Sequence, residues 1–244
     1  KNMAIQTGLN TRLYVEGYDL SGDANSLDGA GYSQSLLDTT ALNTEAITRT
    51  TGLVEGNISF NGFFNNTAGQ SHPVLSSNSG KLPSADQVVL IPFGSAVGDP
   101  FAGLVSKEGE YNVSRSQGSV MTLNASYVSE GIGTEFGDML TAHDDTHSSA
   151  GSGTVLDGGA SSSNGASGYC QIFSLASGSV TVKIQESSSS GGSYSDLITF
   201  STVAAAAAPA AERLTMSGSV ARYIKVTTTG TFSNAVIAVG LHRL

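Results

Sequence analysis

The sequence predicts a mainly β protein, and its composition is the first reason for this prediction. Charged residues make up only 13% and apolar residues 39% of the chain, against roughly 25% and roughly 45–50% in ordinary globular domains. Serine, threonine, asparagine and 30 glycines take their place. Such a composition has a weak helix propensity, and short strands joined by many turns are expected from it.

Alternation of apolar and polar residues is the second reason, because it is typical of half-buried strands. Residues 118–128 place Met121, Leu123, Ala125 and Tyr127 on one face and polar residues on the other. The same kind of pattern predicts strands at residues 12–18 and 57–64, and the nearly continuous apolar run at 87–93 predicts a strand covered on both faces.

One short helix is predicted in this N-terminal half, at residues 38–48. Leu42, Ala46 and Ile47 would pack on one side of it, and Thr39 or Thr40 would cap its first turn. Threonine and asparagine are poor helix-interior residues, so the helix boundaries stay open.

A serine- and glycine-rich stretch at residues 141–167 separates the two halves of the chain. It has few apolar side chains to bury, so we expect most of it to be a linker or a surface loop. Residues 154–156 are the exception and would form the first strand of the C-terminal half. The predicted domains are therefore residues 1–145 and 146–244.

The C-terminal domain is predicted to be a β-sandwich. Residues 180–186 alternate cleanly, with Val180, Val182 and Ile184 facing inward, and a serine- and glycine-rich loop follows at 187–192. Further strands are predicted at 197–200, 213–216, 222–228 and 234–241. Six or seven short strands at fairly regular spacing are typical of a sandwich.

The net charge of −9 is unevenly distributed. Residues 1–140 hold 14 acidic and 6 basic residues, whereas residues 141–244 hold 6 and 5. A DNA-gripping surface needs clustered Lys and Arg to displace counterions, and the sequence has no such cluster. The acidic N-terminal half is expected to repel nucleic acid.

Several other classes of protein are disfavoured by the sequence. No run approaches the roughly 18 apolar residues of a membrane span, and the first residues lack the apolar core of a signal peptide. The single cysteine, Cys170, forms no intramolecular disulfide and is expected to be a small buried thiol. No phosphate-binding loop or dinucleotide fingerprint occurs, so no cofactor is predicted. We expect synthesis in a reducing cytoplasm.

Two segments have a superficial likeness to catalytic or metal sites. Residues 31–35 resemble the nucleophile elbow of α/β-hydrolases around Ser33, but Ser35 replaces its second glycine and no parallel βαβ pattern surrounds it. His143 and His147 flank two aspartates in the predicted linker, where no scaffold would hold metal geometry. A loop serine and a solvated hinge are the preferred interpretations, and neither a catalytic residue nor a metal ligand is predicted.

A known family accounts for the order of segments in residues 1–140. A threonine-rich segment at 39–46 leads through Arg-Thr-Thr-Gly-Leu at 49–53 into Gly-Asn-Ile-Ser-Phe-Asn-Gly-Phe-Phe at 56–64, and a paired strand follows at 118–131. This order resembles the major tail tube proteins of bacteriophages with long, non-contractile tails (siphoviruses). The family often has proline where Thr51 stands. Residues 212–235 resemble the immunoglobulin-like or lectin-like β-sandwiches that such phages append to tail proteins.

The resemblance implies a structural virion protein that assembles in the tail after synthesis in the host bacterial cytoplasm. Six subunits would form a ring around one inner β-barrel, and rings would stack into a tube through which DNA passes without specific binding. A tape measure protein and tail-end proteins are the implied partners, and no membrane is involved. The C-terminal domain would be displayed on the exterior.

Two sets of residues are candidates for roles in such a tube. An acidic lumen would keep DNA from sticking, and Glu108, Glu110, Glu130 and Glu135 are its candidates, with the lumen face left open. A long loop around residues 20–35, unstructured before assembly, would help rings to stack; its candidates are Asp19, Ser21, Asp23, Asp28 and Tyr32.

The alternative hypothesis is a binding module for host glycans or another cell-surface ligand, anchored to the virion. Sugar recognition commonly uses flat aromatic rings, and the chain has no tryptophan. Tyr194, in a serine- and glycine-rich loop, is the candidate glycan contact. A hydrolase built around Ser33 is the third and least favoured hypothesis.

Overall fold

The computed structural model describes residues 8–76 and 81–244 and confirms a mainly β fold. The N-terminal part contains strands β1 (Tyr14–Val15), β2 (Tyr18–Asp19), β3 (Ala24–Asp38), β4 (Arg49–Phe63), β5 (Gln87–Pro92), β6 (Pro100–Ser114), β7 (Thr122–Ser129) and β8 (Glu135–Met139), with helix α1 (Ser71–Leu75). The rest contains β9 (Asp145–His147), β10 (Gly151–Ser152), β11 (Leu156–Asp157), β12 (Ala166–Ser187), β13 (Ser195–Thr199), β14 (Val203–Ala204), β15 (Ala210–Met216) and β16 (Tyr223–Arg243), with the 3-10 turn η1 (Ala205–Ala207). These helical segments are too short to cross a membrane.

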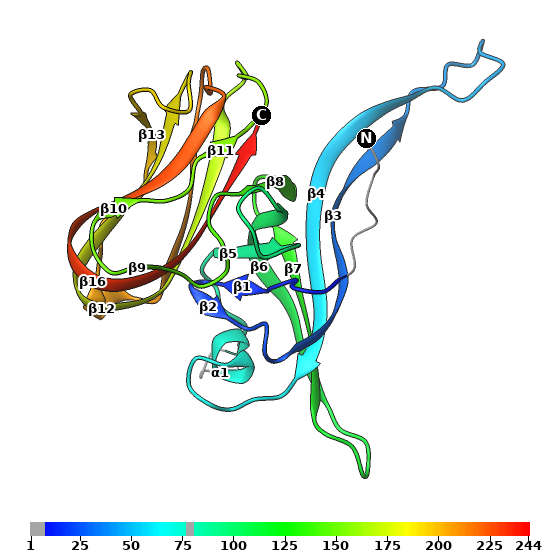
Figure 1. The fold of residues 1–244 in the computed structure, drawn as a ribbon. Coiled ribbons are helices and arrows are strands. Elements are labelled where there is room, and N and C mark those ends of the chain that lie inside the picture. The colour runs from blue at the N-terminus through cyan, green and yellow to red at the C-terminus, as the bar shows by residue number, and fades with distance from the viewer. Residues whose placement is uncertain (1–7, 77–80) are drawn as a thin grey trace.

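The N-terminal part is organised around a four-stranded antiparallel sheet in the order β3–β4–β7–β6. The first half of β6 pairs instead with β5 and β8, and β5 continues the sheet to β1 and β2. Two long hairpins leave the body in different directions: the β3–β4 arm and the β6–β7 hairpin (Figure 1).

The N-terminal core confirms the alternation that the sequence shows. Leu123, Ala125 and Tyr127 of β7 are buried on one face together with Ile58 and Phe60 of β4. All six residues of β5 are buried, as expected for a strand covered on both faces. The opposite face of β4 and β7 carries polar residues and remains at least partly accessible.

The predicted helix at 38–48 is wrong. Asp38 ends β3 and Arg49 begins β4, so the residues between them form the turn at the tip of the arm. The Thr39 amide donates to the Thr48 carbonyl at 2.9 Å, which closes the hairpin. The threonines that weaken helix propensity favour strand and turn here. The helix of this part is α1, beyond β4.

The predicted loop around residues 20–35 is also wrong for most of its length. Residues 24–35 belong to β3 and pair with β4 along the arm. Three register irregularities interrupt this ladder, after Ala24, Leu27 and Gln34. The backbone supplies the pairing, and bulges accommodate the glycine-rich sequence that had suggested a loop.

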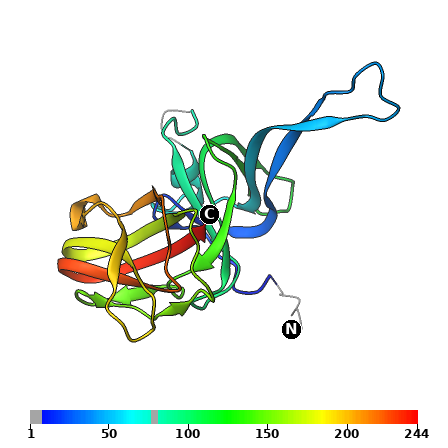
Figure 2. The ribbon, with the colours of Figure 1, turned by 90° about the horizontal axis from the view of Figure 1, so that it is seen from above.

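The C-terminal part is built on one long antiparallel pair, β12 and β16, which runs from Ala166 opposite Arg243 to Ser187 opposite Tyr223. The beginning and the end of each of these two strands contribute buried side chains to one cluster, which includes Ile172, Val182 and Ile237. The pair curls back on itself, as Figures 1 and 2 show, and its register shifts between Ile172 and Ser174. The two segments predicted at 222–228 and 234–241 are therefore one strand.

The predicted linker at 141–167 is not a free segment. The chain runs along the outer edge of β16, where β9, β10 and β11 pair with it in turn. Ser167 already lies in β12, and Leu156 starts β11. Backbone groups alone supply the hydrogen bonds of a strand edge, so a segment that pairs along such an edge needs few apolar side chains.

The two halves of the chain share a third buried cluster, which combines Tyr14, Leu90 and Phe101 with Tyr169 and Ala238. β8 also pairs with β16, so one sheet runs through both halves. The predicted boundary at residue 145 coincides with the start of β9. The division into two domains stays a prediction, since the core continues across it.

A close backbone approach strengthens this junction. Gly17, at φ +79°, turns the chain between β1 and β2, and a Cβ there would lie 2.6 Å from the Ala210 nitrogen. The Gly17 amide donates to Gln171 Oε1 at 2.5 Å, and Gln171 Nε2 donates to the Val88 carbonyl at 2.9 Å. Gln171 is fully buried, so these bonds form out of reach of solvent.

We predict that the shared cluster makes the halves unfold together. Phe101 is fully buried, 5.5 Å from the Tyr169 ring centroid, and a Cβ on Gly240 would lie 2.6 Å from its ring. Phe101→Ala should lower the free energy of unfolding by roughly 3–5 kcal/mol in urea titrations. The control Phe63→Ala, on a half-exposed side chain, should change it by less than about 1 kcal/mol. Two separate wild-type transitions would contradict a shared core.

Candidate assembly surface

The β3–β4–β7–β6 sheet has one face that the body does not cover. Cross-strand pairs share a face, so Asn61 of β4, Asn124 of β7 and Asn112 of β6 lie in one row across the sheet. Ser59 and Ser126 form a neighbouring pair on the same face. We call this surface the polar face.

The asparagine row is hydrogen-bonded from one sheet edge towards the other. Asn61 Nδ2 donates to Asp28 Oδ2 at 2.7 Å, and Asn124 Nδ2 donates to Asn61 Oδ1 at 3.1 Å. At the other edge Asn112 Nδ2 donates to Glu110. Asparagine is depleted in strands, so its recurrence at alternate strand positions is the sequence signal that could have predicted such a face. The row was not among the candidates drawn from the sequence.

The acids of the polar face are Asp28, Glu55 and Glu110. Glu55 is exposed on β4 and shares the face of Asn57, Ser59 and Asn61 by strict alternation. Lys107 also lies on this side, opposite Val128, but it is ion-paired with Asp86 and donates to the Ser84 carbonyl at 2.9 Å. The polar face is therefore acidic to neutral.

A bulge in β6 separates Glu108 from Glu110. Glu108 lies opposite Tyr127 and Glu110 opposite Ser126, so Gly109 is an extra residue in the ladder. Regular alternation would put both glutamates on the same face. The bulge instead turns Glu108 into the core and leaves Glu110 on the polar face.

The four candidate lumen acids thus have different surroundings. Glu110 and Glu130 are exposed, and Glu110 lies on the polar face. Glu108 is buried, which contradicts a lumen-lining role in this conformation. The surroundings of Glu135 also contradict a lumen-lining role, because Arg213 pairs with its carboxylate. The position of Glu108 depends on the bulge at Gly109, and that of Glu135 depends on the pairing of β8. Alternation of apolar and polar residues in the sequence reveals neither feature.

The five candidate stacking residues also separate into two groups. Asp28 and Tyr32 are exposed on β3. Asp19, Ser21 and Asp23 bond within the chain instead. Asp19 pairs with Arg12 at 3.3 Å, Ser21 accepts from the Leu13 amide at 2.9 Å, and Asp23 accepts from the Ser71 amide at 2.9 Å, which holds α1. Their bonds support the local fold.

Both edges of the four-stranded sheet lack a backbone partner within residues 8–76 and 81–244. There β3 pairs only with β4, and residues 107–114 of β6 pair only with β7. Long unpaired edges are strong templates for pairing with another chain. Because four antiparallel strands alternate in direction, β3 of one copy would run antiparallel to β6 of the next.

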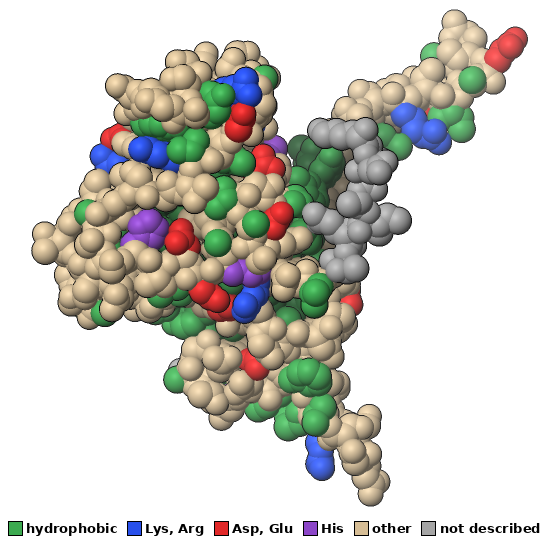
Figure 3. All heavy atoms as spheres, viewed as in Figure 1, with side chains coloured by type: hydrophobic (Ala, Val, Ile, Leu, Met, Phe, Trp, Pro, Cys, Tyr) green, Lys and Arg blue, Asp and Glu red, His purple; other side chains and the backbone are tan. Residues whose placement is uncertain are grey.

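Apolar side chains lie exposed on both hairpins. In the space-filling view, hydrophobic side chains gather where the β6–β7 hairpin leaves the body, and charged ones are sparse along the arm (Figure 3). Leu53, on the arm, is 87% exposed. Other exposed apolar residues of the arm include Leu36, Leu37, Leu42, Ile47 and Val54, and those of the second hairpin include Val113, Val120 and Met121. Such patches mark contact surfaces.

Glu135 joins the two halves of the chain through a compact ion-pair network. Arg213 Nη2 and Nε donate to its two carboxylate oxygens at 2.7 and 2.8 Å, and the Tyr169 and Ser167 hydroxyls donate to it at 2.5 and 2.9 Å. Burial raises the pKa of Glu135, but these hydrogen bonds outweigh burial and hold the pKa below its ordinary value. The carboxylate is ionised at neutral pH.

Ser33 and the histidines that bore on a catalytic or metal site lie on different elements. Ser33 lies exposed on β3, and His72 Nδ1 contacts the Tyr111 hydroxyl at 2.7 Å. His143 precedes β9 and His147 is its last residue, and within the described residues no cluster of three or more His, Cys, Asp or Glu side chains has metal-binding geometry. Tyr194, the candidate glycan contact, has Lys225 Nζ 4.3 Å from its ring centroid. That ring face is occupied.

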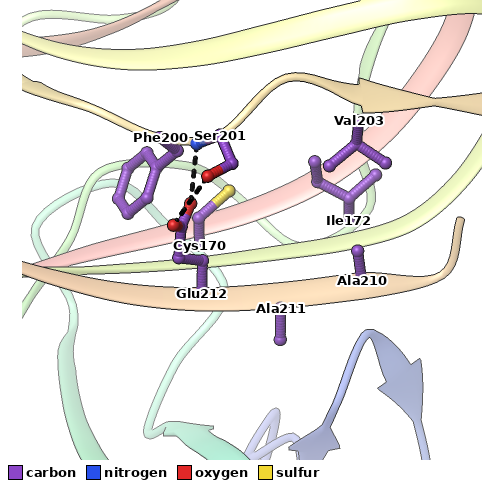
Figure 4. A pocket seen from close by; sticks show the side chains of 8 residues that line it. All are labelled: Cys170, Ile172, Phe200, Ser201, Val203, Ala210, Ala211 and Glu212. Atoms are coloured by element: carbon purple, nitrogen blue, oxygen red, sulfur yellow. Dashed lines mark hydrogen bonds between the residues drawn. The ribbon is translucent and has the colours of Figure 1, made fainter. Parts of the chain in front are cut away.

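One cavity of about 250 Å³ lies in the C-terminal part (Figure 4). Its lining is mostly apolar and comes from β12, β15 and the segment after β13. Its carboxylate, Glu212, accepts from the Ser201 amide and hydroxyl at 2.7 and 2.9 Å. Burial raises the pKa of Cys170, so its thiol stays protonated, as expected of a structural cysteine. No histidine of the described part of the chain lines this cavity.

No family model and no curated protein matches the chain. Among solved structures, it is similar to a chain of the virion of a native gene transfer agent particle, at 16% identity and a TM-score of 0.39, over 54% of this chain and 98% of that one. A chain from the tail of an empty gene transfer agent particle, computed with C6 symmetry, matches at 17% identity and a TM-score of 0.38 over 54% and 98%.

A third structure matches nearly the whole chain. This is the Dit protein (gp 19.1) of SPP1, described as a hub of the adsorption apparatus in phages that infect Gram-positive bacteria, at 8% identity and a TM-score of 0.37, over 96% of this chain and 99% of that one. The structural neighbours are virion and tail components. Likeness this distant establishes no function.

We predict that the Glu135 network stabilises the junction in a pH-dependent way. Arg213→Ala should lower the free energy of unfolding at pH 7 by roughly 3 kcal/mol, because it leaves a nearly buried carboxylate unpaired. The wild-type contribution is present above about pH 4.3, the ordinary glutamate pKa, and is lost as pH falls through the lowered folded pKa.

Denaturant titrations from about pH 3 to pH 7 would measure this. Arg222→Ala is the matched control, because Arg222 pairs with Asp157 at 2.6 Å on the surface. It should leave the unfolding midpoint unchanged. An Arg213→Ala variant as stable as the wild type at pH 7 would refute the role of the network.

Proposed function

We propose that the chain is a structural subunit of a virus tail tube, which closes into rings by pairing β3 of one copy with β6 of the next. The observation that carries this proposal is the four-stranded sheet, which has an unpaired edge at each side among the described residues. A closed ring leaves no edge unpaired. With four strands per copy the antiparallel alternation continues through every junction.

The polar face would be the lumen of such a ring. The other face of the sheet is covered by the body, so closure with the body outward turns the asparagine row and the acids inward. Barrels of 16–18 strands already enclose an aqueous channel, and six copies of four strands exceed that. The number six comes from the sequence resemblance. Asp28, Glu55 and Glu110 would line a conduit that repels passing DNA.

The arm supplies a second contact surface. It extends well beyond the body in Figures 1 and 2, and its exposed leucines would be buried on an adjacent ring. Heterologous stacking of closed rings gives an open-ended tube. A tape measure protein inside the tube and tail-end proteins at its tips would be its partners, and the C-terminal part would lie outside.

Electron microscopy and hydrogen exchange of the purified protein test ring closure. We expect sixfold rings or tubes at high protein concentration. Amides of β3 and of residues 107–114 should gain protection on assembly, whereas those of β4 and β7 are already protected in the monomer.

A control variant separates stacking from closure. The double substitution Leu36→Asp and Leu53→Asp, at exposed arm positions, should leave rings but abolish tubes. A persistent monomer across concentration and salt, or rings in which the two edges gain no protection, would overturn the proposed closure.

The charge of the lumen gives a separate prediction. Assembled wild-type tubes should not retain short linear duplex DNA, whereas Glu55→Lys tubes should retain it at low salt and release it as salt rises. Glu45→Lys, at the exposed arm tip, makes the same change of charge away from the polar face. Equal DNA retention by the two variants would show that the polar face is not the lumen.

A further inference from the structure

A buried acid lies at residues 107–114 of β6, whose outer edge has no strand partner within the described residues and is called the free edge of β6. Glu108 is 4% exposed, and neither of its carboxylate oxygens has a hydrogen-bond partner among the described residues. Opposite it on β7, Tyr127 is fully buried, and its hydroxyl has no partner in the same set of residues. Gln87 of β5 lies on the same face of the sheet as Glu108, and its Oε1 also has no hydrogen-bond partner among the described residues. An ionised carboxylate in such a place is strongly disfavoured.

The described titratable groups around Glu108 supply no cationic partner in direct contact. Tyr127 and Tyr111 face it, and Glu16 acts on Tyr127 from the β1–β2 turn. His72 of α1 lies behind Tyr111, bonded to its hydroxyl at 2.7 Å. Two lysines lie near this region. Lys107, next to Glu108 in sequence, points to the opposite face of the sheet towards Asp86. Lys81 borders the surface hollow beside Gly109 and Tyr111.

The position of Glu108 couples it to the proposed ring interface. Gly109, the bulge residue, follows it directly and is exposed, so the chain reaches water one residue beyond the acid. Residues 107–114 are the half of β6 that is proposed to pair with the next copy. A movement that brings Glu108 to water therefore changes the register of this edge.

We propose that Glu108 is a proton-binding site that controls the free edge of β6. As a neutral acid it fits inside the core and holds the bulge at Gly109 in place. Once ionised, it leaves the core through the bulge and disturbs the 107–114 half-strand. The consequence for ring closure rests on the proposed function, whereas the consequence for the folded monomer does not.

The sign of the pH dependence follows from burial, which raises the pKa of Glu108 to about 8. Between the ordinary glutamate pKa of about 4.3 and this value, the folded chain holds a proton that the unfolded chain releases. Stability therefore falls as pH rises through this window and levels off above it. Ring closure should be favoured at neutral pH and lost as pH rises above about 8.

Thermal unfolding of the wild type, Glu108→Gln and Glu110→Gln between about pH 6 and pH 9 tests the site without requiring assembly. The wild-type Tm should fall by roughly 5 °C or more across this range. Glu108→Gln should lose most of that fall, whereas Glu110→Gln, the exposed neighbour on the polar face, should keep it. Other titrating groups are common to all three proteins and cancel in the comparison.

Ring content by electron microscopy over the same pH range tests the coupling. Wild-type rings should become rare at pH 9, and Glu108→Gln rings should persist. Glu108→Met, which removes the titrating group while keeping an unbranched side chain, replaces the glutamine variant if that variant fails to fold. Identical Tm profiles for the wild type and the folded Glu108 variant would overturn the site. Absence of rings at every pH in every variant would overturn the proposed function alone.

Discussion

Backbone hydrogen bonding at strand edges is the constraint on which this structure depends. Every N–H and C=O group must find a partner in protein or water, and a long, regular strand edge finds it most readily in another strand. In the C-terminal part the chain itself covers both edges of its longest pair, since β8 to β11 pair with β16 in turn and β13 to β15 pair with β12. The N-terminal sheet, as far as the described residues go, has no such cover, because β3 and the second half of β6 end it on both sides. The proposed pairing with a second copy would satisfy these edges.

The faces of the same sheet have divided roles. One face is committed to the core through Ile58, Phe60 and Tyr127, which fixes how the sheet sits on the body. The other carries amides that bond laterally to each other and to acids at the edges. A face whose polar groups are already paired needs no ligand, and this suits a surface that molecules pass without binding. The Gly109 bulge maintains the division by turning Glu108 inward and Glu110 outward.

The junction of the two halves is built from buried polar contacts as well as apolar packing. Gln171 bonds to backbone groups of the β1–β2 turn and β5, and Arg213 neutralises Glu135 from β8. Such contacts specify one orientation more strictly than apolar contacts, because a displaced partner leaves an unsatisfied buried group. The C-terminal part is consequently fixed to the N-terminal sheet, and ring closure would set its position on the outside of the tube.

The sequence by itself determined the mainly β fold, the inward faces of β7 and β12, the full burial of β5 and the buried state of Cys170, because period-two alternation and apolar content depend only on local neighbours. It did not reveal that residues 24–38 and 49–63 form one arm, that residues 145–157 line β16, that Glu108 is buried, or that Glu135 is nearly so. Those features depend on strand pairing and bulges, in which backbone groups far apart in the chain meet regardless of their side chains. Only the tertiary structure decided them, and with them which acids stay exposed and which edges remain open.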